Sequence, residues 1–242
     1  MRIVALLSVV ALLAVPASAE WKWDQLCPVS TYGTASWIDN DTPSDALSAD
    51  DWLCGSSGPI TEVYWTGWSA YGEDYIDHFR LTVWSDVPAT PEDASHPGDM
   101  LWEYNVAGWD YVDPPECADA NNEYHAVIPE LDAFYQEAGT VYWLGIQGVM
   151  VDDGYGDAWY WHMKSQTEPT WGDDAALMSD SFEYAPWWNW GWPEVEPGTA
   201  PELYDGPLPE GWTSVDLSFR LVPEPSALLL VAFGLVVLRR RR

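Results

Sequence analysis

Short runs in which apolar and polar residues alternate recur along the middle of the chain. The clearest covers residues 214–221, where every second residue is apolar, and another covers residues 79–84. A period of two is typical of a β-strand with one buried face. The same reading predicts seven strands, at residues 60–65, 79–84, 101–106, 124–128, 140–147, 159–164 and 214–221.

These strands predict the fold class. Gly, Pro, Asp and Asn separate the runs, and helical periodicity is confined to residues 129–135. Residues 140–147 are apolar on both faces, which is typical of a central strand. Residues 185–212 are rich in Pro, Gly and Trp and indicate a long loop, because the strand after them must return to the sheet. The pattern therefore predicts an all-β fold, a single antiparallel β-sandwich of jelly-roll-like form with long loops.

The two ends of the chain differ from this middle region. Residues 1–19 contain Arg2, an apolar run and a final Ala-Ser-Ala, the layout of a signal peptide. The apolar stretch 227–238 is followed by four arginines, and twelve helical residues span only about 18 Å of a hydrocarbon core about 30 Å thick. We therefore expect a signal peptide at 1–19, an ectodomain at 20–221, and a tail at 222–242 with its membrane helix at 227–238.

The tail has a recognisable three-part form. Pro223, Glu224 and Pro225 precede the apolar stretch, and the arginine cluster closes it. This combination resembles the PEP-CTERM sorting signal. The resemblance implies an exosortase-type membrane protease as partner, in a Gram-negative bacterium, with cleavage near the Pro-Glu-Pro motif. The other interpretation is an ordinary C-terminal anchor, for which the span is short.

The middle region resembles an uncharacterised β-rich ectodomain family that often precedes such tails. The resemblance rests on five short stretches, at residues 49–54, 58–68, 95–102, 142–144 and 215–219. The resemblance implies the fold and the location only, and it carries no activity to this chain.

Charge excludes one class of function. Between residues 20 and 222 four basic side chains stand against 38 acidic ones, a net charge of −34. So negative a surface repels nucleic acid and anionic lipid, and it attracts divalent cations. We expect no nucleic-acid partner.

Cysteine number and compartment together predict one disulfide. Cys27, Cys54 and Cys117 are the three cysteines, and export to an oxidising compartment favours one bond and one remaining thiol. The sequence leaves the pairing open. No CxxC spacing or Cys/His cluster suggests zinc.

Two segments are candidate binding sites. Asp152, Asp153 and Asp157 offer three carboxylates within one turn, which suits calcium, although a solvated acidic turn explains them as well. Eighteen of the 242 residues are tryptophan. Four of these fall on the long loop, as an aromatic platform for a glycan or as a cap on the sandwich: Trp187, Trp188, Trp190 and Trp192.

No nucleophile or catalytic motif stands out. The four histidines are scattered, and residues 55–58 read as a turn instead of a GxSxG elbow. The sequence thus predicts a non-enzymatic exported protein that needs no cofactor, with calcium as an option. It is held at the inner membrane before processing, and then lies at the cell surface or in the extracellular matrix. The alternatives are a carbohydrate-binding module for exopolysaccharide and a secreted jelly-roll hydrolase. The ligand and the oligomeric state stay open.

Overall fold

The computed structural model describes most of the region between the two ends. The described residues are 22–26, 33–39, 45–70, 72–91, 94–112, 117, 122–151, 158–166, 175–179, 188–189 and 214–223. The expected signal peptide, the apolar stretch 227–238 and most of the loop at 185–212 lie outside them. Within the described ranges, no helix combines the length and apolar character needed to cross a bilayer.

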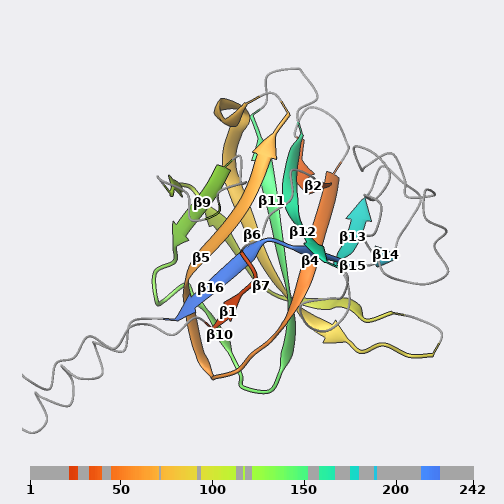
Figure 1. Cartoon of the computed structure of the whole chain (residues 1–242). Coiled ribbons are helices and arrows are strands. Elements are labelled where there is room, and N and C mark those ends of the chain that lie inside the picture. The colour runs from red at the N-terminus through yellow and green to blue at the C-terminus, as the bar shows by residue number, and fades with distance from the viewer. Residues whose placement is uncertain are drawn as a thin grey trace, which may run out of the picture.

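The described chain is all-β and forms two stacked sheets, a β-sandwich-like arrangement (Figure 1). The first sheet contains β1 (Trp23–Asp24), β2 (Gly33–Ala35), β5 (Gly58–Ser69), β8 (Asp110–Tyr111), β9 (Asn122–Val127), β10 (Phe134–Gln136), β12 (Trp159–Gln166), β15 (Ser214–Leu217) and β16 (Phe219–Pro223). The second contains β3 (Trp37–Ile38), β4 (Asp45–Leu53), β6 (Ile76–Val87), β7 (His96–Val106), β11 (Val141–Met150), β13 (Ala176–Ser179) and β14 (Trp188–Asn189). A single 3₁₀ turn, η1 (Glu73–Tyr75), precedes β6.

All seven strands expected from the alternating pattern lie where strands are found, although their boundaries differ. The expected strand 140–147 is β11, which pairs with β4 on one side and β6 on the other, and its central position is confirmed. The expected strand 214–221 is two strands that meet at Ser218. The N–H of Ser218 donates to the carbonyl of His162 on β12, and the carbonyl of Ser218 accepts from the N–H of Thr66 on β5. At this residue the chain passes from one neighbour strand to the next.

The structure differs from the sequence pattern in two places. The helical periodicity at 129–135 corresponds to a tight turn, because Asp132 N bonds to Pro129 O (2.8 Å) and Ala133 N to Glu130 O (3.4 Å). The strand β10 follows at once and pairs with β5. The pairing is also not wholly antiparallel, since β3 runs parallel to β11.

One short segment joins the two sheets, and we call residues 33–38 the strap. Its first half, β2, pairs with β12 in the first sheet, and its second half, β3, lies between β4 and β11 in the second. At Ser36, where the strap changes sheet, the N–H donates to Trp159 O (3.0 Å) and the hydroxyl donates to Ile146 O and accepts from Ser48 N (3.1 Å). Both Ser36 and Ser48 are fully buried, so these bonds form away from water, where a missing partner is costly.

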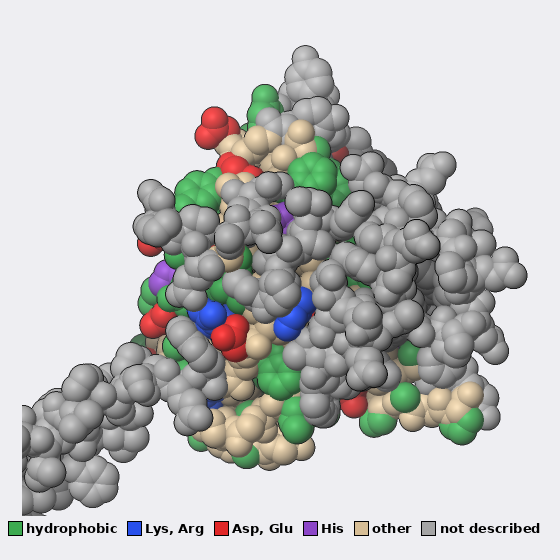
Figure 2. Space-filling model, viewed as in Figure 1, with side chains coloured by type: hydrophobic (Ala, Val, Ile, Leu, Met, Phe, Trp, Pro, Cys, Tyr) green, Lys and Arg blue, Asp and Glu red, His purple; other side chains and the backbone are tan. Residues whose placement is uncertain are grey.

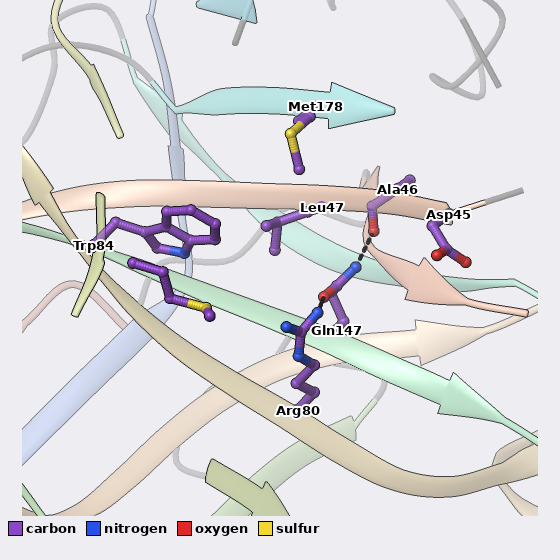
Figure 3. Close-up of a pocket in the computed structure, with 8 residues that line it drawn as sticks. Asp45, Ala46, Leu47, Arg80, Trp84, Gln147 and Met178 are labelled. Atoms are coloured by element: carbon purple, nitrogen blue, oxygen red, sulfur yellow. Dashed lines mark hydrogen bonds between the residues drawn. The ribbon is translucent and has the colours of Figure 1, made fainter. Parts of the chain in front are cut away.

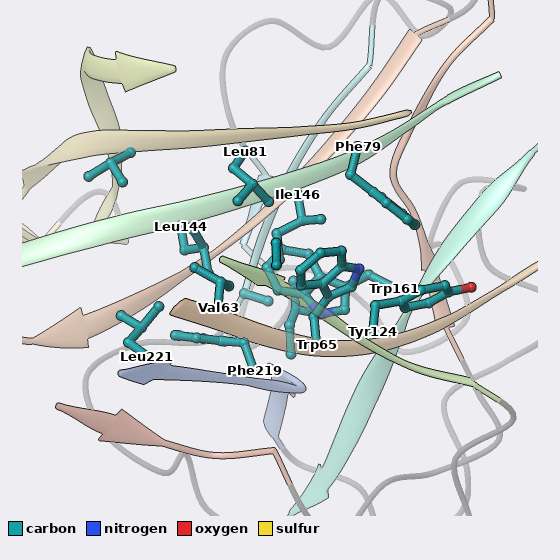
Figure 4. Close-up of a cluster of buried hydrophobic side chains, with 14 of the residues drawn as sticks. Val63, Trp65, Phe79, Leu81, Tyr124, Leu144, Ile146, Trp161, Phe219 and Leu221 are labelled. Atoms are coloured by element: carbon teal, nitrogen blue, oxygen red, sulfur yellow. The ribbon is translucent and has the colours of Figure 1, made fainter. Parts of the chain in front are cut away.

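Aromatic rings fill the space between the sheets (Figure 4). Trp65 on β5 meets the ring of Phe79 on β6 edge to face, with centroids 5.0 Å apart, and stacks on Tyr124 at 5.6 Å. Trp159 is seated where both sheets come close, because an added Cβ at Gly67 would lie 2.3 Å from its ring and one at Gly148 2.7 Å from its Cβ. Four fully buried tryptophans belong to this core, namely Trp52, Trp65, Trp159 and Trp161, and a fifth, Trp143, is buried in a separate cluster with Ala49, Ala176 and Trp84. Much of the unusual tryptophan content therefore serves packing.

The expectation of one disulfide and one free thiol is confirmed. Cys117 is disulfide-bonded and Cys54 is a buried free cysteine, whereas Cys27 lies outside the described residues. The sulfur of Cys117 lies 3.5 Å from the carbonyl oxygen of Leu26, the residue that precedes Cys27 in the sequence. Burial raises the pKa of the Cys54 thiol, which keeps it protonated and unreactive.

We predict that Trp65→Ala lowers the free energy of unfolding by about 4 kcal/mol, the usual cost of removing a large ring from a close-packed core. Urea unfolding followed by circular dichroism measures the change. Tyr135→Ala is the matched control, because Tyr135 is 63% exposed, and it should move stability by less than about 0.5 kcal/mol. Equal effects of the two substitutions would contradict the packing described.

We also predict that peptide mapping without reductant links Cys117 to Cys27 and recovers Cys54 as a thiol. A loop of this length stabilises the fold by about 4–5 kcal/mol in the chain-entropy model, so a reductant should lower the melting temperature strongly. Cys54→Ser should leave the mapped cross-link unchanged. Recovery of all three cysteines as thiols would refute the prediction.

Candidate ligand-binding pocket

The outer face of the second sheet carries the pocket. Along β6, Phe79, Leu81 and Val83 point into the core, so Arg80 and Trp84 point to the opposite face. The same alternation along β11 directs Gln147 outward. Arg80, Trp84 and Gln147 therefore lie together on the outer face of the second sheet.

A pocket of about 220 Å³ opens on this face (Figure 3). Trp84 lies at one end and Asp45 at the other, with Arg80 and Gln147 along one side and Leu47 and Met178 along the other. The lining comes from strands β4, β6, β7, β11 and β13, through Asp45, Ala46, Leu47, Arg80, Trp84, Met100, Gln147 and Met178. The pocket thus has an apolar wall opposite a polar one.

The polar wall is held in place by a chain of hydrogen bonds. Arg80 Nη1 donates to Gln147 Oε1 at 3.2 Å, and Arg80 Nη2 donates to Glu103 Oε2 at 2.5 Å. Gln147 is only 3% exposed, and its Nε2 donates to Ala46 O at 2.8 Å and to Trp37 O at 3.5 Å. The guanidinium therefore has a fixed direction and retains further N–H donors, since it carries five.

The apolar wall depends on a missing side chain. Trp84 Nε1 donates to Thr82 Oγ1 at 2.9 Å, which sets the orientation of the indole. A Cβ added at Gly145 would lie 2.5 Å from Thr82 Oγ1 and 2.8 Å from Leu47 Cδ1. Because residue 145 is glycine, Leu47 and Thr82 can occupy their positions without a clash. Thr82 in turn accepts the hydrogen bond that orients the Trp84 ring at the pocket. Met100 stands at the mouth and is 46% exposed.

The sequence pattern contained part of this site. It placed Arg80 and Trp84 together on the non-core side of one strand, and Arg80 is one of only four basic residues between 20 and 222. That rarity was the available signal. The partners Asp45, Gln147 and Met178 come from strands far apart in the sequence, so only strand pairing brings them together.

The sites expected from sequence lie elsewhere, mostly outside the described residues. Asp152, Asp153 and Asp157 lie outside them, so their calcium binding stays a prediction. Trp187, Trp190 and Trp192 also lie outside the described residues, so the glycan platform stays a prediction. Glu224 and Pro225 of the sorting motif lie outside them as well. Trp188 is placed by its backbone only, in β14, opposite Leu177 of β13. Pro223 ends β16 in register with Ile60 of β5.

A polar cluster lies on the outer face of the first sheet. Glu62 Oε2 lies 3.3 Å from both Tyr64 Oη and His125 Nε2, and the Tyr64 ring stacks on His125 at 4.2 Å. Arg220 lies over the same Tyr64 ring and pairs with Asp24 through two contacts of 3.0 and 3.1 Å. On the face in Figure 2 the basic side chains are likewise few and lie beside acidic ones. These groups therefore contact one another on this face.

A buried carboxyl group lies in the interior. Asp50 is 1% exposed and accepts hydrogen bonds from Gln25 Nε2 and Leu217 N at 2.6 Å and from Asp51 N at 2.9 Å. Burial, with the nearby charges of Asp216 and Asp51, raises the pKa of Asp50 well above its ordinary value. Asp216 is likewise 1% exposed, so both carboxyl groups lie in the interior of the sandwich.

Another carboxyl group, that of Glu73, is half-buried and lies at the end of the first sheet. Glu73 accepts from Tyr124 Oη and from Asn122 Nδ2, both at 2.5 Å, and burial raises its pKa. Burial and the nearby Glu73 charge raise the pKa of Tyr111 to about 12. Among the described residues, no group of three or more His, Cys, Asp or Glu side chains is arranged to hold a metal ion.

Comparison with known proteins gives a family and no activity. No curated protein matches the chain, and no solved structure matches it. Residues 21–222 match the model of a domain of unknown function, DUF7901. This range contains both sheets apart from the last residue of β16, and it includes every residue that lines the pocket. The chain therefore belongs to the DUF7901 family.

Proposed function

We propose that this chain is an exported, non-enzymatic surface protein that holds a neutral sugar unit of an extracellular glycan in the pocket on its second sheet. This assigns the carbohydrate-binding role to Trp84, Arg80, Gln147 and their neighbours. The loop tryptophans at 187–192 are not needed for it.

The observation that carries the proposal is the two-sided lining of the pocket. A sugar ring has one apolar face and a rim of hydroxyl groups. An indole with two methionines and a leucine suits the face, and an oriented guanidinium with a carboxylate suits the rim. At about 220 Å³ the pocket is smaller than the roughly 300–1,000 Å³ of sites for drug-sized ligands, so it suits one sugar unit of a chain.

Charge favours a neutral ligand. Arg80 is paired with Glu103, and Asp45 also lines the pocket. The surrounding domain carries a net charge of −34, which repels uronic acids and sulfated sugars. A neutral hexose meets no such barrier.

Several features support export and sorting. A disulfide at Cys117 is expected in an oxidising compartment outside the cytoplasm. The layouts of residues 1–19 and 222–242 agree with a signal peptide and a PEP-CTERM tail. Under this proposal, an exosortase-type protease removes the tail, and the jelly-roll-like ectodomain then acts at the surface of a Gram-negative cell.

We predict binding to neutral hexose oligosaccharides on a glycan array and weaker binding to uronic-acid oligosaccharides of the same length. Met100→Ala should weaken binding about fivefold, because an exposed apolar contact at the mouth contributes about 1 kcal/mol. Arg80→Lys should weaken it at least tenfold, since lysine keeps the charge but loses the planar fork.

Leu101→Ala is the matched control for Met100→Ala. Leu101 is 49% exposed, adjacent on β7 and not part of the lining, so its loss should leave affinity unchanged. The proposal is wrong if the array shows no neutral ligand, or if Met100→Ala and Leu101→Ala behave alike.

We predict that protein from its native host begins near Glu20 and ends near Pro225. Intact-mass measurement reads both ends at once. Glu224→Ala should slow removal of the tail without changing the melting temperature of the ectodomain. A mature pool that still ends in Arg242 would exclude processing at the motif.

A further inference from the structure

A fully buried histidine lies at the other end of the strap from the pocket. His162 on β12 stands opposite Gly33, the first residue of the strap, and is 0% exposed. Neither of its ring nitrogens has a hydrogen-bond partner among the described residues. A neutral imidazole tolerates such a place, whereas an imidazolium would be a buried charge without a partner.

The strap continues from this histidine to the polar wall of the pocket. Ser36 bonds to both sheets, and Gly148 N donates to Ser36 O at 3.0 Å. The next residue, Trp37, offers its carbonyl to Gln147 Nε2, and Gln147 in turn accepts from Arg80. The orientation of the Arg80 guanidinium therefore depends on β3 staying paired with β4 and β11.

Burial favours the neutral form of the His162 imidazole. Desolvation lowers the pKa of His162 to about 4 from an ordinary value of 6.5. The β2 residues beside it, 33–35, carry no charge. The charged groups nearby in the sheet are Lys164 on its own strand, Asp216 on β15, Glu62 on β5 and Arg220 on β16, which pairs with β5. Lys164 and Asp216 stand opposite each other and have opposite signs, so burial remains the cause of the shift.

The direction of the pH effect follows from this shift. A histidine whose pKa is depressed in the closed structure stabilises that structure fully above the ordinary pKa. That contribution falls as pH drops from about 6.5 towards 4. Any opening that hydrates the imidazole takes up one proton, so each pH unit in this window favours opening about tenfold.

We propose that acidification releases the strap by charging His162, which unseats Gln147 and Arg80 and so discharges the ligand from the pocket. Strap release is a local two-state change, and ligand and proton oppose each other because each binds a different state. The part that concerns ligand rests on the proposed function. The release of the strap does not.

Amide hydrogen exchange measures the release without any ligand. Peptides covering residues 33–38 and 141–150 are compared with peptides from β5 and β6, from pH 7.5 to 4.5, after correction for the intrinsic rate. We expect protection of the strap peptide to fall about tenfold per pH unit below 6.5, while β5 and β6 keep theirs. If all peptides lose protection in parallel, the event is global unfolding and the proposal is wrong.

His162→Phe removes the titrating group and keeps an aromatic ring of similar size. Its strap should show flat protection across the same range. His78→Phe is the matched control, because His78 lies beside Asp77 at the surface, and it should keep the wild-type pH dependence. If His162→Phe does not fold, the wild-type comparison of strap and β6 peptides still decides the proposal. An unchanged pH dependence in folded His162→Phe would overturn it.

Neutral hexose oligosaccharides are then tested at pH 7.5 and 5 on the same proteins. We expect wild type to bind at pH 7.5 and to lose binding at pH 5, whereas His162→Phe should bind at both pH values. Strap release without glycan binding at either pH would reject the proposed function alone. Glycan binding without strap release would reject this inference alone.

Discussion

The hydrogen bonds of Ser36 are the contacts through which the two sheets act as one structure. The residue stands where a six-residue strap changes sheet, and its backbone and hydroxyl reach Trp159, Ile146 and Ser48. Each of these groups is buried, so none has water as an alternative partner. Ser36 therefore ties β12 of the first sheet to β4 and β11 of the second, and this holds β3 beside the polar wall of the pocket.

The aromatic interior adds a second demand. Trp159 fits only because Gly67 and Gly148 approach it from opposite sheets, and Trp65 bridges Phe79 and Tyr124. Large rings at such contacts fix the separation of the sheets closely, because a core packed to crystal density has little slack. This explains why so many tryptophans occur at the centre of the domain. It also removes much of the argument that tryptophan content alone indicates a binding platform.

The alternation of apolar residues predicted the strands that bury one clean face, such as β6 and β12. It failed for β4, where Ser48, Asp50 and Asp51 lie in a strand that is almost wholly buried. Those polar residues are accommodated by specific partners, such as Gln25 and Leu217 N around Asp50, and pairwise contacts of this kind leave no periodic trace. The helix-like spacing at 129–135 was misleading because a turn and a short strand reproduce it over seven residues.

The candidate pocket was predictable only in part for a related reason. Arg80 and Trp84 share a strand face, so local spacing relates them. Gln147 and Asp45 reach them only through the pairing of β11 with β6 and β4, and strand order is not encoded in any single run of residues. The disulfide was expected from number and compartment, whereas the sequence left open that Cys117 is bonded and that Cys54 is a free thiol, whose sulfur donates to Ser56 O.

The end of β16 sets the length of a tether. Pro223 is still paired with Ile60 of β5, and only residues 224–226 separate it from the apolar stretch that begins at Ala227. Three extended residues reach at most about 10 Å. Under the proposed sorting route, the newly exported domain is thus held directly against the bilayer surface until it is cut. A processing enzyme must work in that narrow gap, and a cut on the carboxyl side of Pro223 would free the domain with its last strand intact.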